Sequence, residues 1–233
     1  MLNQDWPWAG FGIGDLEPEW MPRCEWWRSA GTIVLLFDGL KPRLMCPFGD
    51  ASGLSGILAS MKDERIWANI RREFEGTFRQ FYRPEKVVPM RRMYIERPVT
   101  STGEAVCLSL ADQVEIEELL KQGEWVMFLP QALASGHYYG VREKGRLIAM
   151  AGTHLASARY NIAALGTVFT HPDHRGKGLA SICSSHVLAS VGRAGIHRVV
   201  LNVEDEKVTA RRIYERLGFQ TACVYLDGEC ARI

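Results

Sequence analysis

The most constraining feature of this sequence is the stretch Val168–Ala180, which reads Val-Phe-Thr-His-Pro-Asp-His-Arg-Gly-Lys-Gly-Leu-Ala. A β-branched and aromatic run is followed by a turn containing Gly176 and Gly178, and then by helix-forming residues. Two glycines at the start of a helix leave backbone N–H groups uncovered, at the positive end of the helix dipole. Arg175 and Lys177 add positive charge. The stretch therefore predicts an anion site, and a diphosphate is its natural ligand.

The residues after this turn predict a helix, a strand and a second helix. Apolar residues recur on one helical face after the turn, and Gly192 and Gly195 provide places for that helix to end. The β-branched run His197–Val203 predicts a strand. Lys207–Leu217 predicts the second helix, with Gly218 in the position just past its end.

Two common phosphate-binding motifs do not fit these residues. A P-loop has four residues between its glycines and then Lys-Ser/Thr, whereas only Lys177 separates the glycines here and Leu179 follows them. A dinucleotide fingerprint has a third glycine, whose place holds Ser181, and the upstream strands look like hairpins.

A third interpretation takes the whole unit of strand, Arg-Gly-x-Gly turn, helix, strand and Tyr-Glu-Arg-Leu-Gly-Phe helix. This unit resembles the GNAT superfamily of acyl-CoA N-acyltransferases. The resemblance runs from about Leu108 to Asp227 and is strongest in Val168–Ala180 and Val203–Phe219. It implies an α/β (α+β) fold with a mixed, mostly antiparallel sheet flanked by helices.

The resemblance also implies a reaction and its binding residues. An acetyl group passes from acetyl-CoA, the co-substrate, to a primary amine by direct attack of the amine on the thioester. The backbone of Val168, Phe169 and Thr170 is expected to bind the pantetheine, and Asn202 to reach its amides. The residues expected to bind the pyrophosphate are Arg175, Gly176, Lys177, Gly178, Leu179 and Ala180.

Tyr214 is the candidate catalytic residue. It matches the family tyrosine of the motif Tyr214–Phe219, whose hydroxyl lies near the CoA sulfur as general acid. A phenol with an ordinary pKa of about 10 stays protonated at neutral pH and can donate to a thiolate. The alternative is a core aromatic, since Tyr214 belongs to the apolar stripe of its helix.

Two positions depart from the family pattern. Lys207 stands where the family commonly has an asparagine, and Tyr160–Leu165 lacks the carboxylate that many members use as general base. The base therefore stays open between His154, Glu204 or Asp205 acting through water, and a substrate amine that is already partly neutral.

The remaining candidates are mostly structural in this interpretation. His171, before Pro172, is expected to stabilise the turn, and His174 either to be exposed or to touch the phosphate. His137 with Tyr138 and Tyr139 either lines the acceptor side or packs in a strand.

Composition excludes several classes of protein. A net charge of +1 over 233 residues gives no broad nucleic-acid footprint. The N-terminus lacks signal-peptide regions, and no apolar run is long enough to span a bilayer. The six scattered cysteines suit reduced thiols and show no metal-ligand spacing. We expect a cytoplasmic protein without metal, nucleic acid or membrane partners that acts on a small-molecule or peptide amine; the family resemblance allows a homodimer.

The chain divides into two expected domains, an N-terminal α/β half at 1–100 and the acetyltransferase domain at 101–233. The first half is expected to be a degenerate GNAT-like copy that shapes the acceptor side. Its Gly49–Gly53 turn puts Asp50 where a diphosphate would lie, so we expect it to bind no CoA. Elements are expected as an irregular strap in 1–19, strands in 24–28, 32–37, 43–47 and 87–96, helices in 51–61 and 63–82, and a linker in 97–105.

In the second half, helices are expected in 111–121 and 125–135, a hairpin turning at Lys144-Gly145, and a strand in 160–170. Two functions compete with the acetyltransferase. One is an N-acyltransferase that uses another acyl-CoA on an amino acid, and the other is a catalytically silent acyl-CoA-binding module.

Overall fold

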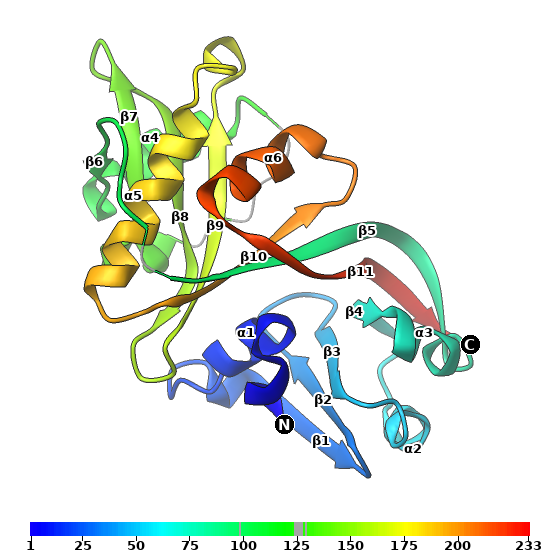
Figure 1. Ribbon diagram of the computed structural model, residues 1–233. Helices are drawn as coiled ribbons and strands as arrows, with labels where there is room; N and C mark the ends of the chain where they lie inside the picture. Colours follow the sequence, from blue (N-terminus) through cyan, green and yellow to red (C-terminus); the bar gives the residue numbers. More distant parts are fainter. Residues whose placement is uncertain (98, 124–127, 129) are drawn as a thin grey trace. The chain divides into compact units, whose positions relative to one another are not determined.

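The computed structural model describes residues 1–97, 99–123, 128 and 130–233 (Figure 1). The helices, with 3-10 helices written η, are η1 Leu2–Asp5, α1 Trp6–Gly14, η2 Met21–Arg23, α2 Leu54–Ser60, α3 Arg72–Phe78, η3 Leu110–Asp112, α4 Gln113–Leu120, η4 Pro130–Ser135, η5 Pro172–His174, α5 Leu179–Arg193 and α6 Val208–Leu217. The strands are β1 Cys24–Ser29, β2 Thr32–Phe37, β3 Leu44–Gly49, β4 Arg65–Arg71, β5 Tyr82–Glu96, β6 Val106–Cys107, β7 Tyr139–Glu143, β8 Arg146–Ser157, β9 Ile162–Thr170, β10 Arg198–Glu204 and β11 Gln220–Arg232. Within these described ranges, no helix has the length and apolar character needed to cross a membrane.

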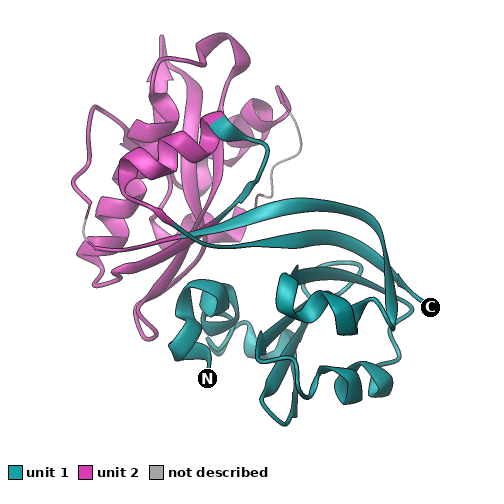
Figure 2. Ribbon diagram, turned by 45° about the vertical axis from the view of Figure 1, so that its right-hand side comes forward, with its two compact units in different colours: residues 1–93, 202–208, 221–233 teal, residues 94–201, 209–220 magenta. Residues whose placement is uncertain are grey.

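The chain forms two compact units that interleave along the sequence (Figure 2). The first unit contains residues 1–93, 202–208 and 221–233, and the second contains 94–201 and 209–220. The strand order is β1-β2-β3-β4-β11-β5 in the first unit and β10-β9-β8-β7-β6 in the second. Most pairs are antiparallel, and helices flank the strands, which confirms the predicted fold class. Whether 1–100 and 101–233 behave as separate domains stays a prediction.

The same order of elements occurs twice in the chain. Three antiparallel strands, a helix, a strand parallel to the third, another helix and a final strand make up both β1–β5 and β7–β11. In each run the parallel ladder is short: Leu44-Met45 pair with Trp67-Ala68, and Ile162–Ala164 pair with Arg198–Val200. The first half is therefore a GNAT-like copy in its order of elements.

The second unit has a helix on each face of its strands. Helix α5 packs on β7, β8 and β9, while α4 and η4 lie against the other face (Figure 1). A buried cluster on the α4 side joins Ile116 and Leu119 of α4 to Met150 of β8 and Phe169 of β9. Phe169 thus anchors the end of β9 in the core.

The prediction of one helix over 63–82 is wrong. Trp67, Ile70, Phe74, Phe78 and Phe81 match a helical spacing, but the structure divides them between strand β4, helix α3 and the turn that follows. The β4 segment also carries the alternation of a strand, with buried residues at Ile66, Ala68 and Ile70. Pairing with β3 and β11 makes this segment a strand and not a helix. That pairing involves residues far away in the sequence, so the sequence of the segment itself does not show it.

The prediction of an irregular backbone over 1–19 is also wrong, because residues 6–14 form helix α1. Pro7 lies in the first turn, where a missing N–H costs nothing. The glycines that suggested irregularity let the helix pack closely: a Cβ on Gly12 would lie 2.9 Å from the Phe48 ring. Burial of aromatic residues is confirmed, since Trp8 is 1% exposed and its indole N–H donates to the carbonyl of Pro47 at 2.8 Å.

The other predicted elements agree with the structure within a few residues. The strands of the first half, the hairpin turning at Lys144-Gly145 and the helices near 51–61 and 111–121 are all present, the last two shorter than predicted. Of the predicted helix at 125–135, the described part contains η4; residues 124–127 and 129, like Pro98 of the linker, lie outside the described residues.

Candidate functional site

Strands β9 and β10 separate after a short ladder. Their parallel pairing ends at Ala164 and Val200, whereas β9 continues to Thr170. Among the described residues of the second unit, β8 is the one strand that pairs with 165–170. The other edge of this part of β9 therefore has backbone N–H and C=O groups that can pair with an extended ligand.

A β-bulge lies in this part of β9, where the strand pairs with β8 along one edge. Met150 pairs with Phe169 and Gly152 with Gly166, so that Ala151 alone is opposite both Thr167 and Val168. Thr167 has a φ of 50°, a left-handed conformation that is unusual for a threonine. A bulge leaves one residue out of the ladder and redirects the backbone beside it. The expected pantetheine-binding residues, Val168 to Thr170, begin at this bulge.

The turn after β9 is built by its own backbone and His171. The His174 N–H donates to the carbonyl of His171 at 2.9 Å, and the Arg175 N–H to that of Pro172 at 3.2 Å. The Nδ1 of His171 accepts the Asp173 N–H at 3.3 Å, which is the turn-stabilising contact expected of this side chain.

Gly176 and Gly178 form an open cradle at the start of α5. Their φ angles are 80° and 77°, and a Cβ built on either one would meet no atom within 4 Å. Gly178 is the N-cap of α5 and has no side chain that could accept the free N–H groups of the first turn, which begins at Leu179 and Ala180. These residues fit a diphosphate, since a ligand can reach the backbone where side chains are missing.

Two cations stand beside the cradle. Arg175 is exposed, and its Nε donates to the Thr170 carbonyl at 3.4 Å. Lys177 is exposed as well, and its Nζ lies 3.4 Å from the Nδ1 of His174. Their charges add to the positive end of the α5 dipole.

The helix that carries Tyr214 ends in a Schellman motif. The Phe219 N–H donates to the Tyr214 carbonyl and the Gly218 N–H to that of Glu215, each at 3.0 Å, while Gly218 has a φ of 99°. Burial raises the pKa of the Tyr214 phenol to about 12. The phenol is therefore neutral at physiological pH, and no hydrogen bond joins it to the cradle within the described part of the chain.

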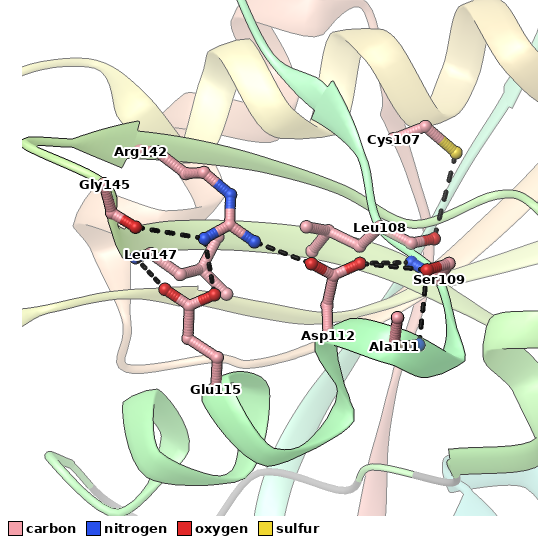
Figure 3. A network of polar contacts seen from close by, with 9 residues as sticks. All are labelled: Cys107, Leu108, Ser109, Ala111, Asp112, Glu115, Arg142, Gly145 and Leu147. Atoms are coloured by element: carbon pink, nitrogen blue, oxygen red, sulfur yellow. Dashed lines mark hydrogen bonds and ion pairs between the residues drawn. The ribbon is translucent and has the colours of Figure 1, made fainter.

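An ion-pair network that sequence reasoning missed fixes α4 on the β7–β8 hairpin (Figure 3). Arg142 binds Asp112 at 2.7 Å and Glu115 at 2.5 Å, and Glu115 also accepts the Leu147 N–H at 2.6 Å. Ser109 and Asp112 form a capping box at the start of this segment, so the Ser-x-x-Asp spacing was a usable signal.

The chain after α4 meets the end of β9 at Gly123. A Cβ on Gly123 would lie 2.4 Å from the Phe169 ring and 3.8 Å from a guanidinium nitrogen of Arg175. Gly123 therefore packs between the end of β9 and a cation of the cradle.

The three candidate bases all have partners. His154 is partly buried against Gly166, whose added Cβ would lie 2.0 Å from the imidazole, and burial lowers the pKa of His154 to about 4. In the first unit, Glu204 pairs with Lys207 at 2.8 Å and Asp205 with Arg91 at 2.5 Å.

The other sequence candidates are held by side-chain contacts. Asn202, in the first unit, accepts with Oδ1 from the Nε of the buried Arg92 at 2.6 Å. Tyr138 is fully buried and donates to the Thr153 carbonyl at 2.8 Å, which makes it a core residue. The Nδ1 of His137 lies 2.9 Å from the Ser190 hydroxyl of α5.

The corresponding turn of the first unit is closed. Asp50 accepts the Ser52 N–H at 2.9 Å, and Thr32 accepts the Gly53 N–H at the same distance. A Cβ on Gly53 would lie 1.9 Å from the Ser29 carbonyl oxygen, so no ligand can reach that backbone.

Comparison with known families adds to this geometry. Residues 106–219 match the model of the Acetyltransferase (GNAT) family, a range that includes the bulged strand, the cradle and Tyr214. These residues form a GNAT acetyltransferase domain. No curated protein matches the chain.

Several solved structures share the fold of the GNAT domain and of the rest of the chain. A GNAT-family protein from Novosphingobium aromaticivorans is 24% identical, with 97% of this chain and 99% of that one covered and a TM-score of 0.64. A GCN5-related N-acetyltransferase from Kribbella flavida is 14% identical, with 98% and 95% covered and a TM-score of 0.66. One from Sphaerobacter thermophilus is also 14% identical, with 98% and 90% covered and a TM-score of 0.64. At these identities the similarity establishes the fold alone.

Proposed function

We propose that this chain transfers an acetyl group from acetyl-CoA to a primary amine by direct attack of the amine on the thioester. The observation that carries the proposal is the open cradle at Gly176 and Gly178. A Cβ built on either glycine would meet no atom within 4 Å. It lies within the residues that match the GNAT family model.

The diphosphate is assigned to the backbone of Gly176 to Ala180 and to the charges of Arg175 and Lys177. The pantetheine is assigned to the free edge of β9 from Val168 to Thr170, where an extended chain can pair as an added strand. A backbone N–H at the bulge is a candidate donor to the thioester oxygen, a contact that is typically worth about 3 kcal/mol. Asn202 remains a candidate for the pantetheine amides through its Nδ2, because Arg92 already donates to its Oδ1.

Tyr214 is proposed as the general acid. Its phenol keeps its proton over the physiological range, because burial raises the pKa to about 12. It can therefore donate a proton to a thiolate leaving group at any pH at which the protein works.

The general base is proposed to be water or the acceptor itself. His154, with a pKa of about 4, is neutral at pH 7 and a weak base, and Glu204 and Asp205 are each engaged by a cation. An acceptor amine that is partly neutral at the working pH needs no strong base. The six free cysteines support a cytoplasmic location for this reaction.

The test is a screen for release of free CoA thiol from acetyl-CoA across primary amines, amino acids and peptides. We expect release above the rate without acceptor for one class of amine. Faster release from a longer acyl-CoA with an amino acid would favour the alternative N-acyltransferase. CoA binding without release on any acceptor would favour a silent acyl-CoA-binding module.

A further inference from the structure

We infer that His174 is a positioning residue of the diphosphate site: it holds Lys177 when neutral and adds a positive charge to the cradle when protonated. The inference rests on the proposed acyl-CoA function and extends it to a side chain outside the glycine turn.

The geometry places two charged groups around one imidazole nitrogen and a second imidazole against its ring. The Nδ1 of His174 lies 3.4 Å from the ammonium of Lys177 and 3.8 Å from the Oε2 of Glu143 on β7. The ring of His171 lies edge-on against that of His174, with centroids 5.5 Å apart, and His171 is itself near the carboxylate of Asp173 at 3.9 Å. The His174 side chain is only 18% exposed, so these neighbours define its surroundings.

The donors and acceptors fix which form of His174 makes each contact. A lysine ammonium can only donate, so Nδ1 accepts from Lys177 only while it carries no proton. Once Nδ1 is protonated, it repels Lys177 and pairs with the carboxylate of Glu143 instead. Protonation therefore exchanges one partner for the other.

The exchange changes the charge next to the cradle. Neutral His174 keeps Lys177 at the base of the turn, whereas protonated His174 frees Lys177 for the ligand and is itself a cation. Protonation of His174 therefore favours the bound diphosphate, which should bind more tightly as the pH falls. By linkage, ligand binding should then be accompanied by proton uptake.

The test measures binding of dephospho-CoA to the full chain by calorimetry at pH 8.0, 6.5 and 5.5. This probe keeps the diphosphate but lacks the 3′-phosphate, a monoester whose second ionisation near pH 6 would obscure the result. At pH 6.5 the measurement is repeated in buffers of different ionisation enthalpy, which gives the number of protons taken up. The variants are His174→Gln, which keeps an acceptor for Lys177 but does not titrate, and His186→Gln as the matched control.

We expect the wild-type protein and the His186→Gln control to bind about tenfold more tightly at pH 5.5 than at pH 8.0, with proton uptake at pH 6.5. His174→Gln should match the wild type at pH 8.0 and lose both effects. Equal pH dependence in His174→Gln and the wild type would overturn the inference while leaving the proposed cofactor intact. Loss of the pH dependence in His186→Gln would overturn it as well, and absence of binding at every pH would overturn both proposals.

Discussion

The ring of Phe219 lies edge-on against the ring of Tyr214, with centroids 6.0 Å apart and planes at 68°. The two residues are also the ends of the Schellman motif, in which the Phe219 N–H donates to the Tyr214 carbonyl. The apolar contact and the hydrogen bond together fix Tyr214 through its backbone and its ring. The Tyr-Glu-Arg-Leu-Gly-Phe motif is thus a helix end that holds one phenol in place.

Replacing Tyr214 with Phe should separate acid catalysis from packing. The ring contact with Phe219 survives in Tyr214→Phe, so CoA affinity and thermal stability should stay close to those of the wild type. Turnover should fall roughly 10²-fold or more, the usual range for loss of a general acid. Steady-state kinetics on one acceptor checks this, and equal turnover of the two proteins would assign Tyr214 to packing alone.

Replacing Gly178 with Val should abolish binding of CoA. In the wild type we expect a micromolar Kd, which corresponds to a binding free energy of about −8 kcal/mol. The side chain fills the space through which a diphosphate reaches the backbone. Gly145→Val is the matched control, because Gly145 has a φ of 81° against 77° for Gly178, and its added Cβ also meets nothing within 4 Å. Both variants carry the same backbone strain, and calorimetry should find CoA binding only in Gly145→Val. Wild-type affinity in a folded Gly178→Val protein would contradict the cradle assignment.

Each chain should bind one CoA. The turn after β3 has its N–H groups taken by Asp50 and Thr32, and the Ser29 carbonyl blocks the approach at Gly53. Calorimetric titration of the full chain should give a stoichiometry of one, which falls to zero in Gly178→Val. A second molecule bound in either protein would show that the first unit has a site elsewhere.

A fragment that begins at Ser101 should be poorly soluble. Residues 225–231 of β11 pair with β4, which the fragment lacks, and Tyr225 and Cys230 of β11 are each 2% exposed in the full chain. Cutting there exposes an unpaired strand and apolar side chains that the first unit covers. Size-exclusion chromatography should find aggregates, and a well-folded, fully active monomer of 101–233 would mean that β11 needs no partner strand.

Stability should fall in mild acid because of His154. Burial lowers the pKa of this imidazole to about 4 in the folded protein, below the unfolded value of about 6.5. Folding favours the neutral form of His154. Its contribution to the free energy of unfolding is therefore complete above pH 6.5 and is lost as the pH falls toward 4. Between pH 7.5 and pH 5 the loss is about 2 kcal/mol. Urea unfolding of the wild type and of His154→Gln checks this, and parallel pH profiles would exclude His154 as the source.

Local patterns were sufficient to predict the cradle and the hairpins. In Val168–Ala180 the strand, the turn and the helix start follow from adjacent residues, and the glycines carry the positive φ that the turn needs. The same holds for Gly218, whose position just past α6 fixes the end of that helix. At these places the local chemistry and the tertiary structure favour the same conformation.

Elements decided by distant partners could not be predicted. Arg65–Arg71 is a strand because residues of β11, more than 150 positions later, pair with it. Buried contacts of single side chains were invisible for the same reason. Arg92 is 1% exposed and stacks against the rings of Trp8, Phe11 and Tyr225, yet nothing in the sequence around the arginine pair Arg91-Arg92 indicates burial.

The pairing of β4 with β11 sets the order in which this protein can fold as it is made. When Arg71 has left the ribosome, the strand that pairs with it at Tyr225 is still about 150 residues away, or about 10–30 s of synthesis at ordinary rates. During that time the edge of β4 that pairs with β11 is open. The helices of the first unit also lack the apolar side chains of β11 that would pack with them. We expect the earlier unit to be completed last, so that translation pausing, early termination or a chaperone acting in this interval governs the yield of folded protein.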